Sequence, residues 1–355
     1  MVKNRIEILK KSLEKDQLDG YIVADENNMF YFTGFEGAEL LLTPANDESV
    51  LYVYSVNYEA AKASAKNCSV ECMQRGEDVD KKVANQCKKL KLKKIGFDSF
   101  DVGSFLAIRK NLKKTQLKGA SQIIREMRKV KDQVELRNMR KAAGLVDIGA
   151  KAAVEAIKPG IREYEVAAEA EYAMRKHGSP GTAFDTIVAS GLSSAYPHGG
   201  CTGKKIKKGE LIQFDVGARY QHYNSDLTRA FLVGKPTPKQ QKMYNIVMEA
   251  QEKAFQKIRE GVKAKQVDAA ARDFIKKQGF GENFVHGLGH GVGLAVHEMP
   301  MLNTVSKDVL KAGNVVTDEP GIYIIGDGGV RIEDTVLVKK NGAERLTKAP
   351  YDLVV

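Results

Sequence analysis

The chain has 355 residues, of which 43% are hydrophobic and 28% are charged, and its 56 Lys and Arg against 45 Asp and Glu give a formal charge of +11. This length predicts about two domains, and the composition excludes a globally disordered chain. No apolar run approaches the ~18 residues of a membrane span, and the charged start lacks the apolar block of a signal peptide. We therefore expect a cytoplasmic protein that has no membrane partner.

The excess positive charge is spread along the chain, and its densest runs are Lys88–Lys94 and Lys204–Lys208. Both runs are interleaved with aliphatic residues, whereas nucleic-acid interfaces interleave basic residues with aromatic ones that stack on bases. We interpret these runs as solvated surface and expect no nucleic-acid partner. Among the four cysteines, Cys68 and Cys72 have no matching Cys/His pair downstream. A zinc knuckle at these cysteines is therefore not expected, and we interpret the cysteines as thiols in a reducing compartment.

Helical and strand patterns alternate in the first third of the chain. Apolar runs between turn residues predict strands, and amphipathic periodicity predicts helices. The expected strands are 21–25, 40–44, 50–54 and 93–98, and the expected helices are 3–17, 57–66 and 78–90. We expect an α/β domain over residues 1–122, followed by a charged connector, REMRKVKD (125–132), and a second domain over residues 123–355.

The second domain begins with a helical pattern over 132–157, for which Asp132 is a suitable N-cap and Pro159-Gly160 is a stop signal. Strand patterns dominate the last 45 residues, at 315–325 and 328–340. Three more helices are expected between them, over 162–178, 239–261 and 265–279. No tandem repeat is visible.

Two acids stand in a predicted β-hairpin of the second domain. Asp215 lies in the apolar strand LIQFDVGA, and Asp226 begins the returning strand SDLTRAFLV. A carboxylate among apolar residues is costly to bury unless it is paired or bound to a metal. Two such acids on adjacent strands can converge on one cation or two; the alternative is a pair of edge-strand acids that face solvent.

Histidines gather with glycines further along the chain. The segment FVHGLGHGVGLAVHEMP holds His286, His290 and His297, and glycines flank His290 on both sides. Glycine keeps the backbone open for the close approach of a ligand. Three histidines in such a short Gly-rich segment are not a usual core pattern, so we expect metal binding or catalysis here, although the pattern is not HExxH.

Two further acids lie in the C-terminal strands. Glu319 precedes Pro320, which favours extended backbone at a strand end. Glu333 lies in GGVRIEDTVLV, with Arg331 on the same strand face by the period of two. By themselves, Glu333 and Arg331 are equally consistent with a simple ion pair. With Asp215, Asp226 and His290, these acids make an oxygen-rich donor set that suits Mn, Fe(II) or Co.

At this point the motifs resemble a known family. GHGVGL (289–294), EPGIY (319–323) and VRIED (330–334) together resemble the pita-bread metallopeptidases, which include prolidases, aminopeptidases P and, more distantly, methionine aminopeptidases. NMFYFTGF and REMRKVKD resemble the creatinase-like N-terminal domain and its connector. The resemblance covers nearly the whole chain, and its closest match is to short Xaa-Pro dipeptidases.

The resemblance implies a fold, a reaction and a set of site residues. The fold is an α/β creatinase-like domain followed by an α+β catalytic domain with a curved, largely antiparallel sheet. The reaction is metal-dependent hydrolysis of the bond before proline in X–Pro dipeptides by a hydroxide that bridges two divalent metal ions per subunit. Manganese or cobalt is expected, with iron or zinc as alternatives, and so is a homodimer. The implied metal ligands are Asp215, Asp226, His290, Glu319 and Glu333.

Further residues receive roles by the same resemblance. His198, in the loop FDTIVASGLSSAYPHG, and His297 would donate hydrogen bonds to the substrate and to the developing oxyanion. Glu319 would also move a proton to the leaving nitrogen. His286 would contact the substrate pocket, and Arg331 offers a fork suited to a dipeptide carboxylate.

Three alternatives share the fold. Aminopeptidase P has the same ligands and accepts longer peptides, creatinase-type amidinohydrolases lack the metal ligands, and some relatives are non-enzymatic binding modules that have lost ligands. Two departures from the family pattern are Ala295, where a glutamate is common, and Asp318, where an apolar residue is usual. Neither removes a ligand, and we expect the extra acid Asp318 to face solvent.

Overall fold

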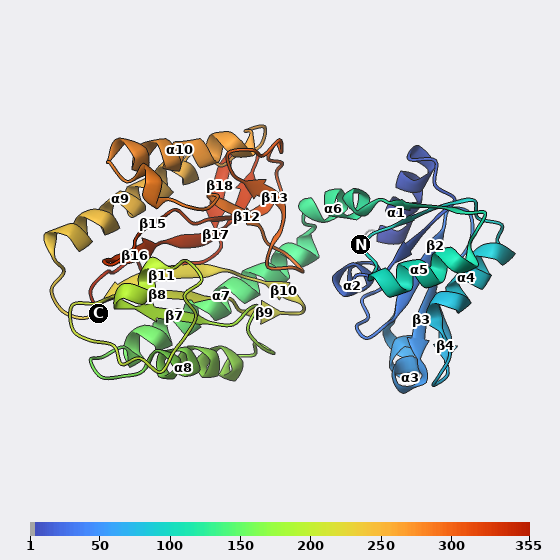
Figure 1. The fold of residues 1–355 in the computed structure, drawn as a ribbon, viewed down its shortest axis with the longest axis horizontal. Coiled ribbons are helices and arrows are strands. Elements are labelled where there is room, and N and C mark those ends of the chain that lie inside the picture. The colour runs from blue at the N-terminus through green and yellow to red at the C-terminus, as the bar shows by residue number, and fades with distance from the viewer. Residues whose placement is uncertain (1–3) are drawn as a thin grey trace. The chain divides into compact units, whose positions relative to one another are not determined.

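The computed structural model describes residues 4–355, which divide between Met127 and Arg128 into two compact units (Figure 1). Each unit has its own sheet and apolar core. The division between the units falls inside helix α6 (Ser121–Lys129). No helix within residues 4–355 is long and apolar enough to span a membrane.

The first unit is built on a mixed six-stranded sheet with the order β4-β3-β2-β1-β5-β6. The pairs β1/β2 and β2/β3 are antiparallel, whereas β1/β5, β3/β4 and β5/β6 are parallel. The elements are α1 (Arg5–Lys15), β1 (Gly20–Val23), α2 (Glu26–Thr33), β2 (Leu40–Pro44), β3 (Val50–Tyr54), α3 (Ser55–Ser64), β4 (Ser69–Met73), α4 (Val79–Lys89), β5 (Lys94–Phe97), α5 (Val102–Asn111) and β6 (Gln116–Gly119).

Local sequence explains where these elements begin. Asn4, Asp25, Asp78 and Asp101 each accept a hydrogen bond from a backbone N–H in the first turn of the helix that follows. Short polar side chains are strongly preferred at this position. The strands β1 and β2 are mostly apolar and every residue in them is buried, as is typical of strands covered on both faces.

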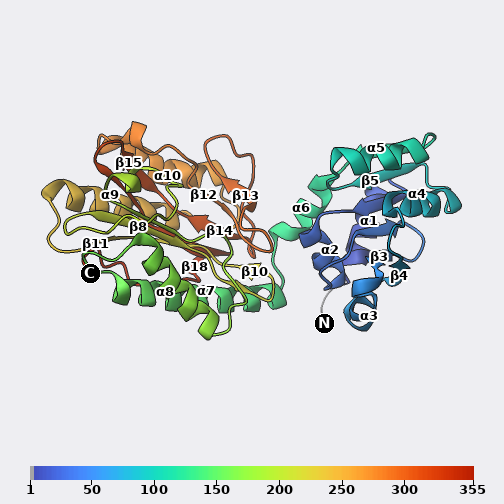
Figure 2. The ribbon, with the colours of Figure 1, turned by 60° about the horizontal axis from the view of Figure 1, so that its bottom comes forward.

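Four helices flank the sheet of the second unit: α7 (Gln133–Ala156), α8 (Glu163–Lys176), α9 (Pro238–Phe255) and α10 (Ala264–Lys277). A capping box between Asp132 and Glu135 starts α7. In Figures 1 and 2 the pairs α7/α8 and α9/α10 lie on opposite sides of the strands. Each pair covers its own apolar core against the sheet.

The large sheet of this unit has the order β13-β12-β14-β17-β11-β8-β7, with β18 also paired to β17, and every neighbouring pair is antiparallel. Its strands are β7 (Ile187–Ser190), β8 (Leu211–Val216), β11 (Leu227–Leu232), β12 (Gly289–Gly291), β13 (Glu298–Leu302), β14 (Val315–Asp318), β17 (Glu333–Lys339) and β18 (Gly342–Arg345). Two hairpins complete the unit: β9 (Arg219–Tyr220) with β10 (Tyr223–Asn224), and β15 (Gly321–Ile324) with β16 (Gly328–Arg331).

The expected fold class is confirmed: an α/β unit precedes an α+β unit with an antiparallel sheet. Two local predictions differ from the structure. The connector is helical through Lys129, because Ile124 is buried and Gln122 bonds Glu126 one turn later. The helix predicted over 239–261 ends at Phe255, where the chain turns and Ile258 enters the core. Helix α2 was not predicted.

Candidate metal centre

Five neighbouring strands bring the predicted ligands together. His290 lies on β12, Glu319 directly follows β14, Glu333 begins β17, Asp226 directly precedes β11, and Asp215 lies on β8. These strands are consecutive in the sheet, in the order β12-β14-β17-β11-β8. The register aligns them, since Thr228 of β11 lies opposite both Asp215 and Glu333. Glu333 and Asp226 therefore occupy the two central positions of the row.

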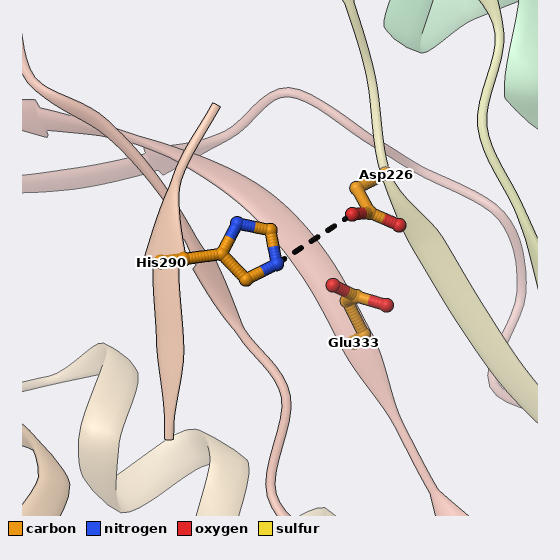
Figure 3. A group of neighbouring side chains, drawn as sticks. All are labelled: Asp226, His290 and Glu333. Carbon is orange, nitrogen blue, oxygen red and sulfur yellow. Dashed lines mark ion pairs between the residues drawn. The ribbon is translucent and has the colours of Figure 1, made fainter. Parts of the chain in front are cut away.

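Asp226, His290 and Glu333 form one close group of potential ligands. One potential ligand atom from each lies within 4.8 Å of the others, and all three residues are buried. His290 Nε2 stands 3.7 Å from Asp226 Oδ2. Figure 3 shows the three side chains pointing toward one another from separate strands. This is a suitable arrangement for a divalent cation.

Glu319 forms an ion pair with the same histidine. Its Oε1 lies 3.2 Å from His290 Nε2 and accepts a hydrogen bond of 2.9 Å from the hydroxyl of Thr317. Thr317 Oγ1 also accepts from the backbone N–H of His290 at 3.0 Å. A single threonine thus holds both residues in place.

Asp215 is paired with Arg331, whose guanidinium is buried. The Nη2 group donates to Asp215 Oδ2, Nε donates to Thr228 Oγ1 at 3.0 Å, and Nη1 donates to Tyr323 OH and to the Pro197 carbonyl at 3.0 and 3.1 Å. These contacts use four of the five N–H donors of arginine. Arg331 therefore contacts Asp215 and the Pro197-His198 loop, and within residues 4–355 one of its N–H donors has no partner.

Electrostatics favour protons on the central carboxylates in the absence of a cation. Burial, together with the charge of the neighbouring acid, raises the pKa of both Asp226 and Glu333 well above the usual range. Burial opposes ionisation of Glu319 too, but the hydrogen bond and charge of His290 outweigh it and lower its pKa to about 2. Burial likewise disfavours the charged form of His290, but Glu319 raises its pKa to about 9.

The residues fit a divalent metal centre. Four carboxylates and one imidazole are hard, oxygen-rich donors of the kind that bind Mn, Co or Fe(II). Within the described chain, Asp215 Oδ1 is buried and has no hydrogen-bond partner, which is costly for a carboxylate unless something else binds it. A cation bound to this atom would supply the missing partner.

Metal-stripped protein is expected to be stabilised thermally by Mn²⁺ or Co²⁺, and the gain in melting temperature should be larger at pH 8 than at pH 6. A cation stabilises the state that binds it and must displace the protons that the raised pKa values keep on Asp226 and Glu333. Those protons compete less as the pH rises, so apparent affinity increases. Differential scanning fluorimetry at fixed cation concentration measures the shift. Equal shifts at both pH values, or a full shift in Asp226→Asn, would contradict this assignment.

The remaining predicted residues surround the ligand group. The His297 ring lies edge-on to that of His290 at a centroid distance of 4.2 Å, and its side chain is exposed. His286 Nε2 is 2.9 Å from Tyr323 OH, so it connects to Arg331 through that hydroxyl. His198 is exposed on the loop after β7.

Charged partners fix the residue next to His297. Glu298 Oε1 accepts from Lys131 Nζ at 2.6 Å, and Arg128 donates to Glu298 Oε2. Burial opposes ionisation of Glu298, but the two cations outweigh it and lower its pKa. The start of the second unit is therefore joined to the segment that carries His297.

Sequence reasoning missed the threonines that support the ligands. Thr228 Oγ1 donates to Glu333 Oε2 at 2.6 Å, Thr317 supports Glu319, and Thr335 Oγ1 donates to the Asp226 carbonyl at 2.8 Å. A signal was available: Asp226, Glu319 and Glu333 each have a threonine two positions away, and residues two apart share a strand face.

A buried polar network behind the ligand strands was also missed. Asp334 is completely buried and accepts hydrogen bonds from Arg229, Thr347, Gln251 and Tyr351 at 2.6–2.9 Å. Arg229 also donates to the Glu333 carbonyl at 2.6 Å. The network therefore fixes the backbone of a ligand residue from the opposite face of the sheet.

The expectation that Asp318 faces solvent is wrong. Asp318 is completely buried on β14 opposite Asp334, and in the described chain neither carboxylate oxygen has a hydrogen-bond partner. Burial raises its pKa well above the usual range, and the nearby Arg345 only partly offsets this. Strand alternation turns Asp318 away from Glu319, toward the face that α9 covers.

Replacing Asp318 by Val is therefore expected to increase the free energy of unfolding by about 1–3 kcal/mol, because an unsatisfied buried carboxyl is costly and a β-branched residue suits a strand. Urea denaturation of metal-stripped protein measures the change. Asp318→Asn, which stays polar, should gain less. A destabilised Asp318→Val variant would mean that this carboxyl has a partner in solution.

Both units resemble known protein families. Residues 137–340 match the model of metallopeptidase family M24, and residues 5–130 match that of the creatinase/prolidase N-terminal domain. The Xaa-Pro dipeptidase of Pyrococcus furiosus is 41% identical over 355 residues, which cover 99% of this chain and all of the relative. The crystal structure of the prolidase from Pyrococcus horikoshii OT3 superposes with a TM-score of 0.92 at 40% identity over 98% of this chain and 99% of that one. The X-Pro aminopeptidase structure from Thermotoga maritima MSB8 gives 0.87 at 35% identity over 97% and 100%.

Proposed function

The chain belongs to metallopeptidase family M24, and from this premise we propose that it is a dinuclear metal hydrolase that cleaves the bond before proline in X–Pro dipeptides. One observation supports two cations rather than one. The strand order puts Asp226 and Glu333 between His290 and Glu319 on one side and Asp215 on the other. Two central carboxylates flanked by ligands on both sides can be shared between neighbouring cations.

Asp215, Asp226, His290, Glu319 and Glu333 would hold the cations. When bound, they supply Lewis-acid chemistry, which polarises the scissile carbonyl and lowers the pKa of water to near neutrality. His290 must bind as the neutral imidazole, so the proton that it shares with Glu319 leaves first. This requirement also removes the ion pair that lowers the pKa of Glu319 in the ligand-free structure.

Glu319 is the proposed proton carrier. An X–Pro bond has no N–H, so its nitrogen must be protonated as it leaves. The hydrogen bond from Thr317 and the contact with His290 both fall on Glu319 Oε1. That leaves Oε2 to take up a proton and deliver it to the imide nitrogen.

The surrounding side chains would bind and orient the substrate. His198 and His297, both exposed, would donate hydrogen bonds to the substrate and to the oxygen that gains charge, each worth ~3–4 kcal/mol in the transition state. His286 would line the pocket, fixed by Tyr323. Arg331 has one N–H left for the dipeptide carboxylate after its contacts with Asp215 and the Pro197 carbonyl.

A second candidate is an aminopeptidase that acts on longer peptides, since the Thermotoga maritima X-Pro aminopeptidase is 35% identical. Initial rates on X–Pro dipeptides and X–Pro–Y tripeptides, measured with Mn, Co and Zn, separate the two. We expect cleavage of dipeptides that stops on full metal removal and returns with Mn or Co. Faster turnover of tripeptides would favour the aminopeptidase, and metal-independent cleavage would overturn both candidates.

Three further assignments complete the proposal. Residues 1–122 form the creatinase-like domain and 123–355 the catalytic domain, the chain pairs into a homodimer, and it works in the cytoplasm. The free thiols of all four cysteines suit a reducing compartment.

A further inference from the structure

A buried glutamate outside the metal centre ties together the two ends of the loop that carries His198. Glu163 is the first residue of α8 and is completely buried. Its Oε1 accepts hydrogen bonds from the backbone N–H and the hydroxyl of Ser190 at 2.8 and 2.7 Å. Its Oε2 accepts from the backbone N–H of Thr202 at 3.1 Å and from the Thr202 hydroxyl.

These four bonds fill the acceptor sites of an ionised carboxylate. The α8 N-terminus adds a favourable field for a negative charge. Lys204 Nζ donates to Ser190 Oγ at 2.7 Å and pairs with Glu210, so a cation also lies beside this group. Only a carboxylate satisfies all four donors, because the amide nitrogen of Gln would itself present N–H groups to two of them.

Ser190 and Thr202 delimit the segment 191–201, which contains a 3₁₀ turn (Gly191–Ala195) and then His198. Ser190 is the last residue of β7, so Glu163 binds the loop at the point where the chain leaves the sheet. Further along the loop, the Pro197 carbonyl accepts from Gln213 and Arg331 at 3.2 and 3.1 Å. The backbone of this loop is thus held at both ends and beside His198.

The His198 side chain has no such support. Within residues 4–355 the structure gives its imidazole no hydrogen-bond partner, and the side chain is exposed. The carbonyl of the preceding Pro197 accepts from Arg331, which also donates to Asp215, so the loop brings His198 next to a proposed ligand. The place of this imidazole beside the metal centre therefore depends on the loop backbone.

We infer that Glu163 is a positioning residue for His198: it fixes both ends of the loop and so sets where the imidazole meets the substrate. This inference rests on the proposed function, in which His198 contacts the substrate. Glu163 touches neither the substrate nor the ligands, and it acts through the loop alone.

A double-mutant cycle on the metal-loaded enzyme tests the inference. Glu163→Gln should lower kcat/KM for an X–Pro dipeptide by about 10–100-fold, a range comparable to the loss of groups that orient metal ligands. In the His198→Ala background the same change should cost less than about twofold, because residues that act through one another are not additive. Glu165→Gln is the matched control, because Glu165 lies two residues after Glu163 in α8, is exposed and accepts only a capping hydrogen bond from the Arg162 backbone in the described chain. Its kcat/KM should remain near wild type in both backgrounds.

Thr202→Val is the second variant, in case Glu163→Gln does not fold, since it removes one donor to Glu163 and keeps the carboxylate. It should show the same coupling to His198→Ala with a smaller loss. Equal losses in the presence and absence of His198 would overturn the inference, because a general loss of stability acts in both backgrounds.

A readout without substrate separates this inference from the proposed function. The chain has six histidines, so the His198 imidazole signal in a proton–nitrogen NMR spectrum can be identified by its loss in His198→Ala. Glu163→Gln should shift or broaden that signal and leave the His177 signal in place. An unchanged His198 signal would refute the positioning role, whereas a changed signal without X–Pro cleavage would refute only the proposed function.

Discussion

Replacing Glu333 by Gln is expected to lower kcat/KM for an X–Pro dipeptide by about 10³-fold or more. Glu333 lies on the central strand of the five that carry the proposed ligands, and its ligand atom lies within 4.8 Å of those of Asp226 and His290. An amide is a neutral ligand and cannot be shared between two cations as a carboxylate can. Lewis-acid assistance is worth several kcal/mol, and each 1.36 kcal/mol corresponds to a factor of ten in rate.

The same substitution should not unfold the protein. Gln keeps the volume of Glu, and its oxygen can still accept the hydrogen bond from Thr228. Burial and Asp226 raise the pKa of Glu333, so a neutral side chain relieves the cost of a charge at this position when metal is absent. We expect metal-stripped Glu333→Gln to be at least as stable as wild type in urea.

Kinetics, metal analysis by mass spectrometry and urea denaturation together check this prediction. Glu344→Gln is the matched control, since Glu344 forms surface ion pairs with Arg140 and Lys339 and should leave turnover unchanged. Activity of Glu333→Gln within tenfold of wild type would remove Glu333 from the ligand set.

Much of the candidate site could be predicted from the sequence because its residues break local rules. Asp215 and Asp226 interrupt apolar strands, and His290 sits among glycines that permit close backbone contacts. A Cβ on Gly289 would lie 2.2 Å from the Thr317 carbonyl, and one on Gly291 would lie 2.4 Å from that of Met299. Acids within apolar strands and glycines beside a histidine can each be recognised in a single short segment of the sequence.

The row of five proposed ligands could not be derived from periodicity. β12, β14, β17, β11 and β8 are neighbours in an order that differs from their order in the chain, and only the β8/β11 hairpin is local. Non-local pairing is decided by packing of the whole unit. The resemblance to a known family supplied this information, and the matches to family M24 confirm that resemblance.

Asp318 shows why burial was harder to predict than chemistry. Its neighbour Glu319 drew attention to one face of the strand, yet alternation places Asp318 on the other face. That face is shielded from solvent by α9, which is distant in sequence and whose Gln251 donates to the Asp318 carbonyl at 3.3 Å. Glu163 and Asp334 were missed for a similar reason. The sequence alone does not distinguish a buried acid whose oxygens all accept hydrogen bonds from an acid on the surface.

The largest loss of stability is expected from Arg229→Met. Arg229 is buried and donates to Asp334 Oδ1 at 2.9 Å and to the carbonyls of Thr228, Glu333 and Ala349 at 2.6–3.2 Å. Met fills part of the volume but removes the cation that is hydrogen-bonded to the buried Asp334, which then retains the longer 3.7 Å contact with Arg345 Nε. Breaking a buried pair by removing one partner costs about 3–5 kcal/mol, which urea denaturation of the metal-stripped protein measures.

Arg140→Met is the comparison, because Arg140 forms an exposed pair with Glu344 and such pairs contribute about 0–1 kcal/mol. The double variant Arg229→Met/Asp334→Leu should recover part of the loss, since a buried pair replaced by apolar residues of similar size is often neutral. Recovery would show that the loss comes from the uncompensated charge of Asp334. If Asp334→Leu instead lowers the stability further, the loss in Arg229→Met comes from the hydrogen bonds to the Glu333 and Ala349 carbonyls. Arg229 would then stabilise the backbone of the strand that carries Glu333.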